Sequence, residues 1–200
     1  MITLEDPIEY VYEPAQAIIN QREVGVDVES YDKGLYAALR EDPDVILIGE
    51  MRDPATIETA LMAAETGHLV FSTIHTNSAI DSIDRIVGVF PEDKQPQIRM
   101  QLSMTLRAVL SQQLVPRAGG QGRAVACELM MLTPAIRNLI RDGKTPQMQS
   151  YLLSSAKEGS ITMDNFLIRM AKEGVITPQT AVDSSQDPQE LREKLAAVQY

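Results

Sequence analysis

The sequence predicts an α/β fold with a mainly parallel sheet over residues 1–132, followed by a small all-helical region over residues 133–200. Short apolar runs alternate with amphipathic helical patterns as far as residue 132, which is typical of helices layered on a sheet. One pair of apolar runs encloses a single helical pattern with almost no loop, which predicts parallel neighbouring strands. From Thr133 onward, strand signals stop and helix start signals recur.

The clearest β-α-β pattern lies in the first half of the chain. A helical pattern over residues 30–40 precedes an apolar run at residues 44–50. Asp53 is then followed by a proline. This pair predicts the start of a helix, with Asp53 as the N-cap and the proline at the first helical position. We expect this helix to end at Gly67, because glycine adopts the left-handed conformation easily, and a strand at residues 68–74 to follow. The two strands are therefore predicted to be parallel neighbours, with the helix crossing one face of the sheet.

Further along the chain, residues 78–87 and 97–114 have helical patterns. The glycine-rich segment at residues 117–123, RAGGQGR, leads into a strand and has no following lysine. It therefore predicts a hairpin-like turn and not a phosphate-binding loop. In the helical region, the predicted helix starts are Thr133, Thr162, Thr177 and Asp187, and the predicted stops are Gly143 and Gly174. Its predicted core consists of Ile136, Leu139, Ile140, Phe166, Leu167 and Met170.

Composition excludes several classes of protein. The net charge of −10 argues against nonspecific nucleic-acid binding, because a basic face is needed to neutralise phosphates. No run approaches the roughly 18 to 20 apolar residues of a membrane-spanning helix, and the first residues lack a signal-peptide pattern. We expect a soluble cytoplasmic protein, without direct membrane insertion, that reaches a membrane only through a partner. Cys127 is the only cysteine, which excludes an internal disulfide, and we expect it to be a small core residue.

Acidic residues gather beside predicted strands. Glu5, Asp6 and Glu9 lie in the segment TLEDPIEY, and Glu50 follows the apolar run at residues 44–50. Carboxylates at the carboxyl ends of parallel strands lie where ligands bind in open α/β sheets. Such a group can hold Mg²⁺ through water or orient an attacking water. Any one of these acids alone is more often a surface or capping residue.

The two histidines bracket one predicted strand. His68 and His75 are seven residues apart, so in a regular strand they point to opposite faces, which disfavours a shared zinc site. His68 follows a helix end and has a structural alternative as a partner for helix-end carbonyls, whereas His75 is placed to contact a phosphate. Arg22, Arg40 and Arg52 could also place charge near phosphates, although a single arginine is by default a surface ion-pair partner.

No G-x-x-x-x-G-K-[ST] segment occurs in the 200 residues. Such a loop supplies the backbone N–H groups, the lysine and the hydroxyl that hold phosphates and metal in P-loop enzymes. The residues alone therefore predict an acidic half-site without a phosphate-binding loop.

Three segments together resemble motifs of the secretion-superfamily ATPases. TLEDPIEY at residues 3–10 resembles their Asp box, LREDPDVILIGEMRD at residues 39–53 their Walker B region, and AAETGHLVFSTIHTNSAIDSIDRIVGVFP at residues 63–91 their His box. AIRNLIRDGK at residues 135–144 is similar to a motif of the type IV pilus retraction motors within this superfamily. The resemblance extends to about residue 150, and it favours the retraction branch over the extension and type II secretion branches.

The resemblance implies roles for individual residues. Glu9 corresponds to a catalytic glutamate that polarises the attacking water, and Glu50 to the Walker B glutamate near Mg²⁺ and the γ-phosphate. Gly49 stands where many P-loop enzymes have an aspartate, so the contact of Glu50 with Mg²⁺ is expected to pass through water. Together with Arg22, the expected nucleotide-binding residues are Glu5, Asp6, His68 and His75. ATP and Mg²⁺ are the implied cofactors.

The resemblance also implies an architecture and partners. Residues 1–132 would form part of a RecA-like ATPase core and residues 133–200 a helical subdomain. Members of the family form hexameric rings that work with an inner-membrane pilus platform protein, so the expected location is cytoplasmic and peripheral to the inner membrane. Family members carry a PAS-like domain and the Walker A segment before the Asp box, so we expect this chain to correspond to their C-terminal part.

Three hypotheses remain open from the sequence. The first is the ATPase portion of a pilus retraction motor. The second is a non-catalytic, truncated or pseudo-ATPase module that joins or modulates intact motor subunits, although a pseudoenzyme would be expected to lack some of Glu9, Glu50 and His75. The third, a zinc hydrolase that uses both histidines and Glu50, is disfavoured by the strand spacing.

Overall fold

The computed structural model describes residues 1–197 and divides the chain into two compact units. Residues 198–200, the end of the predicted helical region, lie outside the described part. The first unit contains residues 1–75 and 85–105, and the second contains residues 76–84 and the chain from residue 106 onward. The elements in chain order are β1 (Ile2–Glu5), β2 (Asn20–Glu23), α1 (Tyr31–Ala38), β3 (Val45–Ile48), α2 (Pro54–Glu65), β4 (Leu69–Ser72), α3 (Ala79–Gly88), α4 (Gln95–Thr105), β5 (Ala108–Pro116), β6 (Arg123–Met131), α5 (Pro134–Arg141), η1 (Thr145–Gln147), α6 (Met148–Ser154), η2 (Ala156–Glu158), α7 (Met163–Lys172), α8 (Pro178–Asp183) and α9 (Pro188–Ala197).

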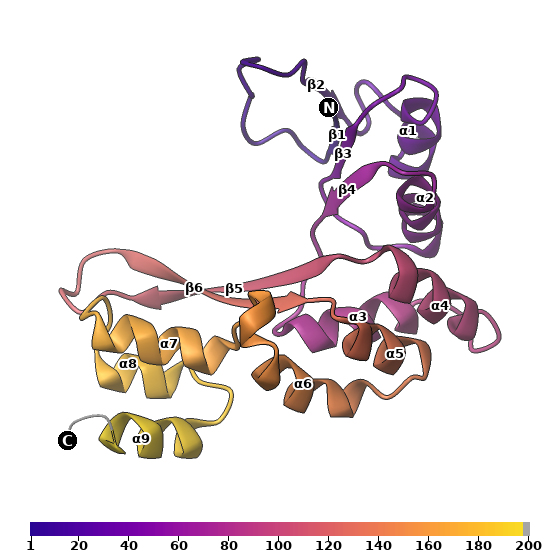
Figure 1. The fold of residues 1–200 in the computed structure, drawn as a ribbon. Helices are drawn as coiled ribbons and strands as arrows, with labels where there is room; N and C mark the ends of the chain where they lie inside the picture. The colour runs from indigo at the N-terminus through magenta and orange to yellow at the C-terminus, as the bar shows by residue number, and fades with distance from the viewer. Residues whose placement is uncertain (198–200) are drawn as a thin grey trace. The chain divides into compact units, whose positions relative to one another are not determined.

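The first unit is built on a four-stranded parallel sheet in the order β2-β1-β3-β4. Helices α1 and α2 lie on one face of this sheet (Figure 1). The core between them consists of Leu4, Leu35, Ile46, Ile48, Ala60 and Ala63. Side chains alternate across the strands, so Ile46 and Ile48 are fully buried while Leu69 and Phe71 on β4 are about half exposed. The predicted parallel pairing of β3 and β4 is confirmed.

The ends of α2 follow from local sequence. The Asp53 carboxylate accepts hydrogen bonds from the Thr56 N–H at 2.9 Å and the Thr56 hydroxyl at 2.7 Å, which satisfies a donor of the first helical turn. Gly67, with a φ of 102°, turns the chain from the end of α2 into β4. Both predicted boundaries are confirmed, and they determine where β3 and β4 begin and end.

The second unit is built on a long antiparallel ribbon of β5 and β6. The glycine-rich turn at residues 117–122 joins the two strands, which confirms the predicted hairpin-like connection. The predicted helix at residues 97–114 is wrong in its second half, because α4 ends at Thr105 and the chain enters β5 at Ala108. The apolar spacing of this segment fits a helix, but nine consecutive residues of β5 pair with β6, and this long-range pairing outweighs the local pattern.

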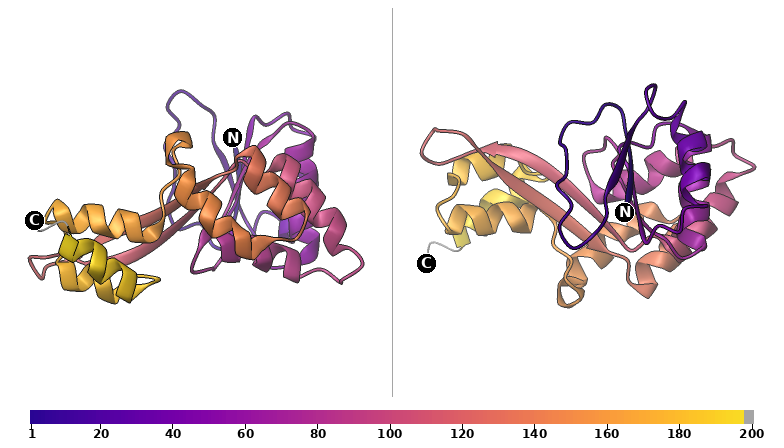
Figure 2. Two further views of the ribbon diagram at one scale, coloured as in Figure 1. Left: turned by 60° about the horizontal axis from the view of Figure 1, so that its bottom comes forward. Right: turned by 90° about the horizontal axis from the view of Figure 1, so that it is seen from above.

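Helices α7, α8 and α9 share a core with the ribbon. Val115, Ala124 and Ala126 of the ribbon are buried together with Leu167, Ile176 and Leu191 of the helical region. Helix α7 runs alongside the ribbon in every view (Figures 1 and 2). The predicted N-caps Thr133, Thr162 and Thr177 each accept a hydrogen bond from a backbone N–H three residues later. The predicted domain boundary after residue 132 stays a prediction. The two compact units of the structure divide the chain elsewhere, at residues 75/76, 84/85 and 105/106.

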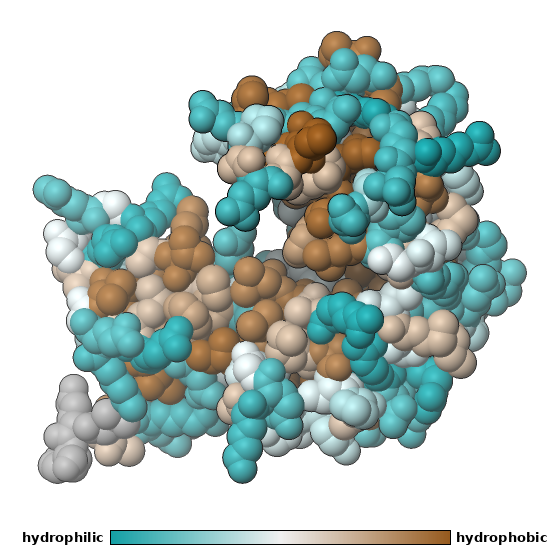
Figure 3. Space-filling model, turned by 45° about the horizontal axis from the view of Figure 1, so that its top comes forward, coloured by the Kyte–Doolittle hydropathy of each residue, from teal (hydrophilic) through white to brown (hydrophobic). Residues whose placement is uncertain are grey.

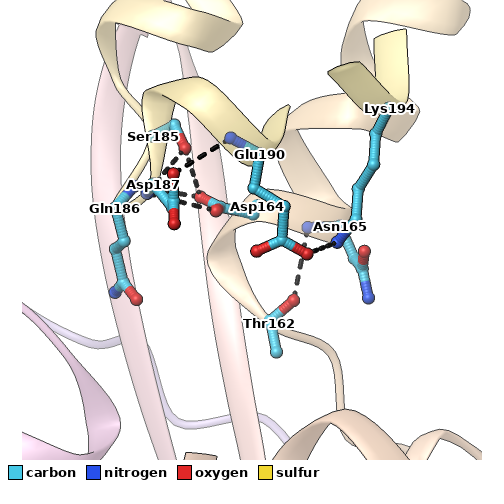
Figure 4. Close-up of polar contacts among 8 residues, drawn as sticks. All are labelled: Thr162, Asp164, Asn165, Ser185, Gln186, Asp187, Glu190 and Lys194. Carbon is cyan, nitrogen blue, oxygen red and sulfur yellow. Dashed lines mark hydrogen bonds and ion pairs between the residues drawn. The ribbon is translucent and has the colours of Figure 1, made fainter. Parts of the chain in front are cut away.

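Hydrogen bonds from Ser185 and Gln186 to Asp164, together called the polar clasp, connect the segment before α9 to α7 (Figure 4). The Asp164 carboxylate accepts hydrogen bonds from the Ser185 hydroxyl at 2.9 Å and from the Gln186 N–H at 3.0 Å. Asp187 in turn caps α9 by accepting from the Glu190 N–H at 3.0 Å. The helix start predicted at Asp187 is therefore confirmed.

A buried carboxylate joins three elements of the second unit. Glu128 on β6 is 1% exposed. One of its oxygens accepts from the Ala79 N–H at 2.8 Å, and the other accepts from the Met163 N–H at 3.2 Å. These are the first residues of α3 and α7, whose N–H groups have no partner inside their helices. Glu128 therefore fixes two helix starts to the ribbon.

The surface mixes apolar and hydrophilic side chains (Figure 3). Leu110, Leu114 and Val125 lie on one face of the ribbon and are exposed by 60%, 58% and 46% respectively. Cys127, which was expected in the core, is only partly buried. Within residues 1–197, no helix has the length and apolar character needed to cross a membrane.

Candidate active site

Polar side chains meet at the carboxyl end of the parallel sheet. Strand β1 ends at Glu5, β3 is followed by Gly49 and Glu50, and β4 leads to His75. The Glu50 side chain is 17% exposed, and its carboxylate lies 2.6 Å from the Arg52 guanidinium and 3.2 Å from the His75 Nε2 atom. The structure therefore brings Glu50, Arg52 and His75 together, at the edge where parallel α/β sheets bind ligands.

Glu5 and Asp6 belong to the same neighbourhood. The Glu5 carboxylate accepts hydrogen bonds from the Thr3 hydroxyl at 2.6 Å and from the Gln21 amide at 2.9 Å. The charges of Glu5 and Asp6 both act on Tyr31, the first residue of α1. Asp6, Glu50 and Glu5 are therefore all near enough to Tyr31 for their charges to act on it, and the roles of these acids stay predictions.

Gly49 allows the backbone to pack closely at this edge. Its N–H donates to the Leu4 carbonyl at 2.7 Å, and its own carbonyl accepts from the Thr73 hydroxyl at 2.5 Å. A Cβ atom at this position would lie 3.1 Å from the Tyr31 hydroxyl and 3.3 Å from the Leu4 carbonyl oxygen. Position 49 therefore has little room for a side chain, and no carboxylate arises from it.

Electrostatics at the site favour an ionised Glu50. The hydrogen bond from Arg52 lowers the pKa of Glu50, and the charge of His75 adds to this effect, while burial opposes it. The pKa of Tyr31 is raised first by burial and then by the negative charges of Asp6 and Glu50. The His75 side chain is 82% exposed, so a ligand can reach it while it contacts Glu50.

Glu9 is not part of this cluster in the structure. It is exposed in the loop at residues 6–19, and within residues 1–197 no hydrogen bond or ion pair is formed by its carboxylate. The loop itself is held to the sheet by the Gln21 amide, which donates to the Tyr10 carbonyl at 2.9 Å and accepts from the Tyr12 N–H at 2.7 Å. The catalytic role of Glu9 stays a prediction.

Arg22 and His68 also have other partners. Arg22, on β2, forms an ion pair with Glu41 at 2.7 Å. The His68 Nδ1 atom lies 3.0 Å from the Ala63 carbonyl oxygen, at the end of α2. His68 precedes β4 and His75 follows it, so the two histidines stand at opposite ends of one strand. Nucleotide binding by Arg22 and His68 stays a prediction.

The donor set suits a hydrated magnesium ion. Glu5, Asp6 and Glu50 offer carboxylate oxygens, the ligand type that Mg²⁺ prefers, and Mg²⁺ usually keeps several of its waters. Among the residues that the structure describes, no three His, Cys, Asp or Glu side chains converge closely enough to enclose an ion. The contact of Glu50 with Mg²⁺ through water, which the resemblance implies, stays a prediction.

Three polar residues of the site were not predicted from the sequence. Gln21 supports both Glu5 and the loop of Glu9, Thr73 bonds the Gly49 carbonyl, and Tyr31 faces the acids. A polar residue within the short strand NQRE was the only available signal for Gln21. Tyr31 belongs to no motif, and Thr73 lies within the segment that resembles the His box without being singled out there, so only tertiary contacts place the two residues at this site.

Comparisons with known proteins agree with the fold and the motifs. The model of the type II/IV secretion system protein family matches residues 1–182. The type IV pilus retractation ATPase PilT of Pseudomonas aeruginosa is 48% identical over 189 residues, which is 94% of this chain and 55% of that protein. A twitching motility protein of Neisseria gonorrhoeae is 47% identical over 181 residues, which is 90% of this chain and 48% of that protein. The chain therefore spans about half the length of the curated relatives it matches.

Solved structures give the same result. The crystal structure of the pilus retraction motor PilT with bound ADP matches with a TM-score of 0.87 and 53% identity, over 96% of this chain and 54% of that one. The α/β fold class with a parallel sheet and the resemblance inferred from the motifs are both confirmed. The chain belongs to the type II/IV secretion system protein family, and its motifs are those of the secretion-superfamily ATPases.

Proposed function

We propose that this chain is the ATPase portion of a hexameric motor that hydrolyses ATP to drive type IV pilus retraction, and hence twitching motility. One observation carries the proposal: the Glu50 carboxylate, held by Arg52 and His75, lies with Glu5 and Asp6 at one edge of the sheet. Relatives that are retraction ATPases carry related sequence throughout this region. An acidic sheet edge beside an accessible histidine suits a nucleotide and its metal ion.

Each site residue has a role in this proposal. Glu50, whose pKa is lowered by Arg52, would hold Mg²⁺ through water, and Glu9 would polarise the attacking water. Glu5 and Asp6 shape the acidic wall of the site. His75, which contacts Glu50 from an exposed position, responds to the terminal phosphate, and Arg22 and His68 contribute to nucleotide binding. The magnesium ion, when bound, neutralises phosphate charge.

The proposed assembly and location follow from the family. The complete motor is a hexameric ring in which nucleotide binds between domains, and tighter binding of one nucleotide state shifts each subunit toward a closed form. The ring acts on an inner-membrane pilus platform protein, so the chain is cytoplasmic and peripheral to that membrane through its partner. It has no nucleic-acid partner and does not itself insert into the membrane.

The alternative is a non-catalytic module that joins or modulates rings of intact subunits. Retention of Glu9, Glu50 and His75 favours the active motor, because a module without catalysis has no need of them. Both hypotheses agree on ring assembly and differ on ATP turnover.

A hybrid ATPase separates the two hypotheses. In this hybrid, the chain replaces the matching segment of Pseudomonas aeruginosa PilT, so the rest of that protein supplies all other parts. We expect the hybrid to hydrolyse ATP, and we expect Glu50→Ala and Glu9→Ala each to lower turnover at least about 100-fold, the lower range for loss of a general base. Nucleotide affinity should change only a few-fold.

The control variant is Glu92→Ala, which removes an exposed acid outside the cluster and should leave turnover unchanged. A hybrid that forms rings and binds nucleotide without hydrolysing it would support the non-catalytic module. Near-normal turnover in Glu50→Ala would refute the assigned role of Glu50.

A further inference from the structure

Tyr31 presents its hydroxyl group to the acidic edge of the sheet. It is the first residue of α1, and its ring packs against the core formed by Leu4, Leu35 and Ile48. Because the ring is fixed by this packing, the position of the hydroxyl is determined by the fold.

The hydroxyl occupies the volume that a side chain at position 49 would need. It lies 3.1 Å from the place where a Cβ atom on Gly49 would be. Gly49 immediately precedes Glu50 and hydrogen-bonds β1 through Leu4. The phenol oxygen of Tyr31 thus lies beside Gly49, the residue before Glu50, and position 49 itself has no side chain.

The charge around the hydroxyl favours a cation over an anion. Three carboxylates act on it, those of Asp6, Glu50 and Glu5, against the single positive charge of Arg52. A phosphate oxygen at this point would be repelled by the carboxylates, whereas a metal ion with its waters would be attracted. Within residues 1–197 the Tyr31 hydroxyl makes no hydrogen bond, so its oxygen remains able to accept one and its proton to be donated.

We propose that the Tyr31 hydroxyl contacts the hydrated magnesium ion of a bound nucleotide, its oxygen accepting a hydrogen bond from a metal-bound water. This inference rests on the proposed function and adds a ligand-contacting residue to that site. Tyr31 provides a neutral hydroxyl oxygen beside Gly49, which has no side chain, and Glu50 provides the negative charge next to it. Tyr31 and Glu50 would hold the ion through its waters.

The test is nucleotide binding by the hybrid ATPase with and without magnesium. Titration calorimetry measures the affinity for ADP in excess Mg²⁺ and again in excess EDTA. Tyr31→Phe keeps the ring and removes only the oxygen. We expect its affinity for ADP in Mg²⁺ to fall about three- to tenfold, as for loss of one hydrogen bond, and its affinity in EDTA to stay within about twofold of the unaltered hybrid.

Tyr36→Phe is the matched control, because Tyr36 lies on the same helix, is 55% exposed and is outside the acidic cluster. It should leave both affinities unchanged. Equal affinities of Tyr31→Phe and the unaltered hybrid in Mg²⁺ would overturn the inference, and so would an equal loss in Mg²⁺ and EDTA. If the unaltered hybrid binds no nucleotide, the proposed function fails first and this inference fails with it.

Discussion

The buried carboxylate of Glu128 gives the sharpest test of how the second unit is held together. Glu128→Ala removes the acceptor of two backbone N–H groups, those of Ala79 and Met163. Both groups begin helices and have no partner inside them. Since Glu128 is 1% exposed, water cannot easily replace its oxygens. We therefore expect a large destabilisation from a residue that is outside the candidate active site.

The magnitude follows from the two lost hydrogen bonds. Leaving one buried donor without a partner costs about 1–3 kcal/mol, and loss of a helix N-cap costs about 0.5–2 kcal/mol. The two contacts, at 2.8 Å and 3.2 Å, therefore predict a loss of about 2–4 kcal/mol. Glu128→Gln keeps one acceptor oxygen at nearly constant volume, so its loss should be about half as large.

Native-state hydrogen exchange measures this quantity within the second unit. The free energy of opening is followed at amides of β6 and α7, which report unfolding of their own region. Glu190→Gln is the control, because Glu190 is an exposed acid on α9 whose ion pair with Lys194 is worth under about 1 kcal/mol. A loss below about 0.5 kcal/mol in Glu128→Ala, comparable to that of a surface change, would refute the reasoning.

Four further predictions concern the site and its surroundings. Arg52→Ala removes the main cause of the lowered pKa of Glu50, so Glu50 should become protonated at a higher pH than in the unaltered hybrid. The fall of ATP turnover on the acid side of the pH profile should therefore shift to higher pH. An unchanged pH profile would contradict this. Gly49→Ala brings a Cβ to 3.3 Å from a backbone carbonyl and should destabilise the first unit by about 1–3 kcal/mol in urea unfolding, a prediction that unchanged stability would exclude. Asp164→Ala frees the clasp on α9 and should speed amide exchange at the start of that helix but not in β3. The isolated chain, which contains no G-x-x-x-x-G-K-[ST] segment, should bind ATP weakly or not at all by calorimetry, whereas micromolar affinity would show that other residues hold the phosphates.

Local sequence signals made it possible to predict the helix ends and the strand pairing of the first unit. Asp53 before a proline and Gly67 after an apolar helical face specify both ends of α2, and one short helix between two apolar runs leaves parallel pairing as the simple solution. The same topology brings Glu50 and His75 to one edge of the sheet. The central part of the site was therefore predictable without any knowledge of distant contacts.

Other features depend on contacts that a sequence pattern does not carry. Residues 106–114 have helical spacing but pair with a strand beyond the turn, and nothing local distinguishes the two outcomes. Tyr31 reaches the acids because α1 packs across the ends of β1 and β3, which is a tertiary arrangement. The ion pair of Arg22 with Glu41 likewise joins residues that no motif connects.

Pilus retraction in Pseudomonas aeruginosa whose own PilT is replaced by the hybrid ATPase tests whether the acidic sheet edge around Glu50 powers a working motor. Retraction is followed as twitching on a surface, with hybrid abundance and surface pili measured alongside. We expect the hybrid to restore twitching, and we expect Glu50→Ala to abolish it at equal abundance with pili still assembled. Undiminished twitching in the Glu50→Ala hybrid would contradict the claim that this acidic sheet edge is where the motor hydrolyses ATP.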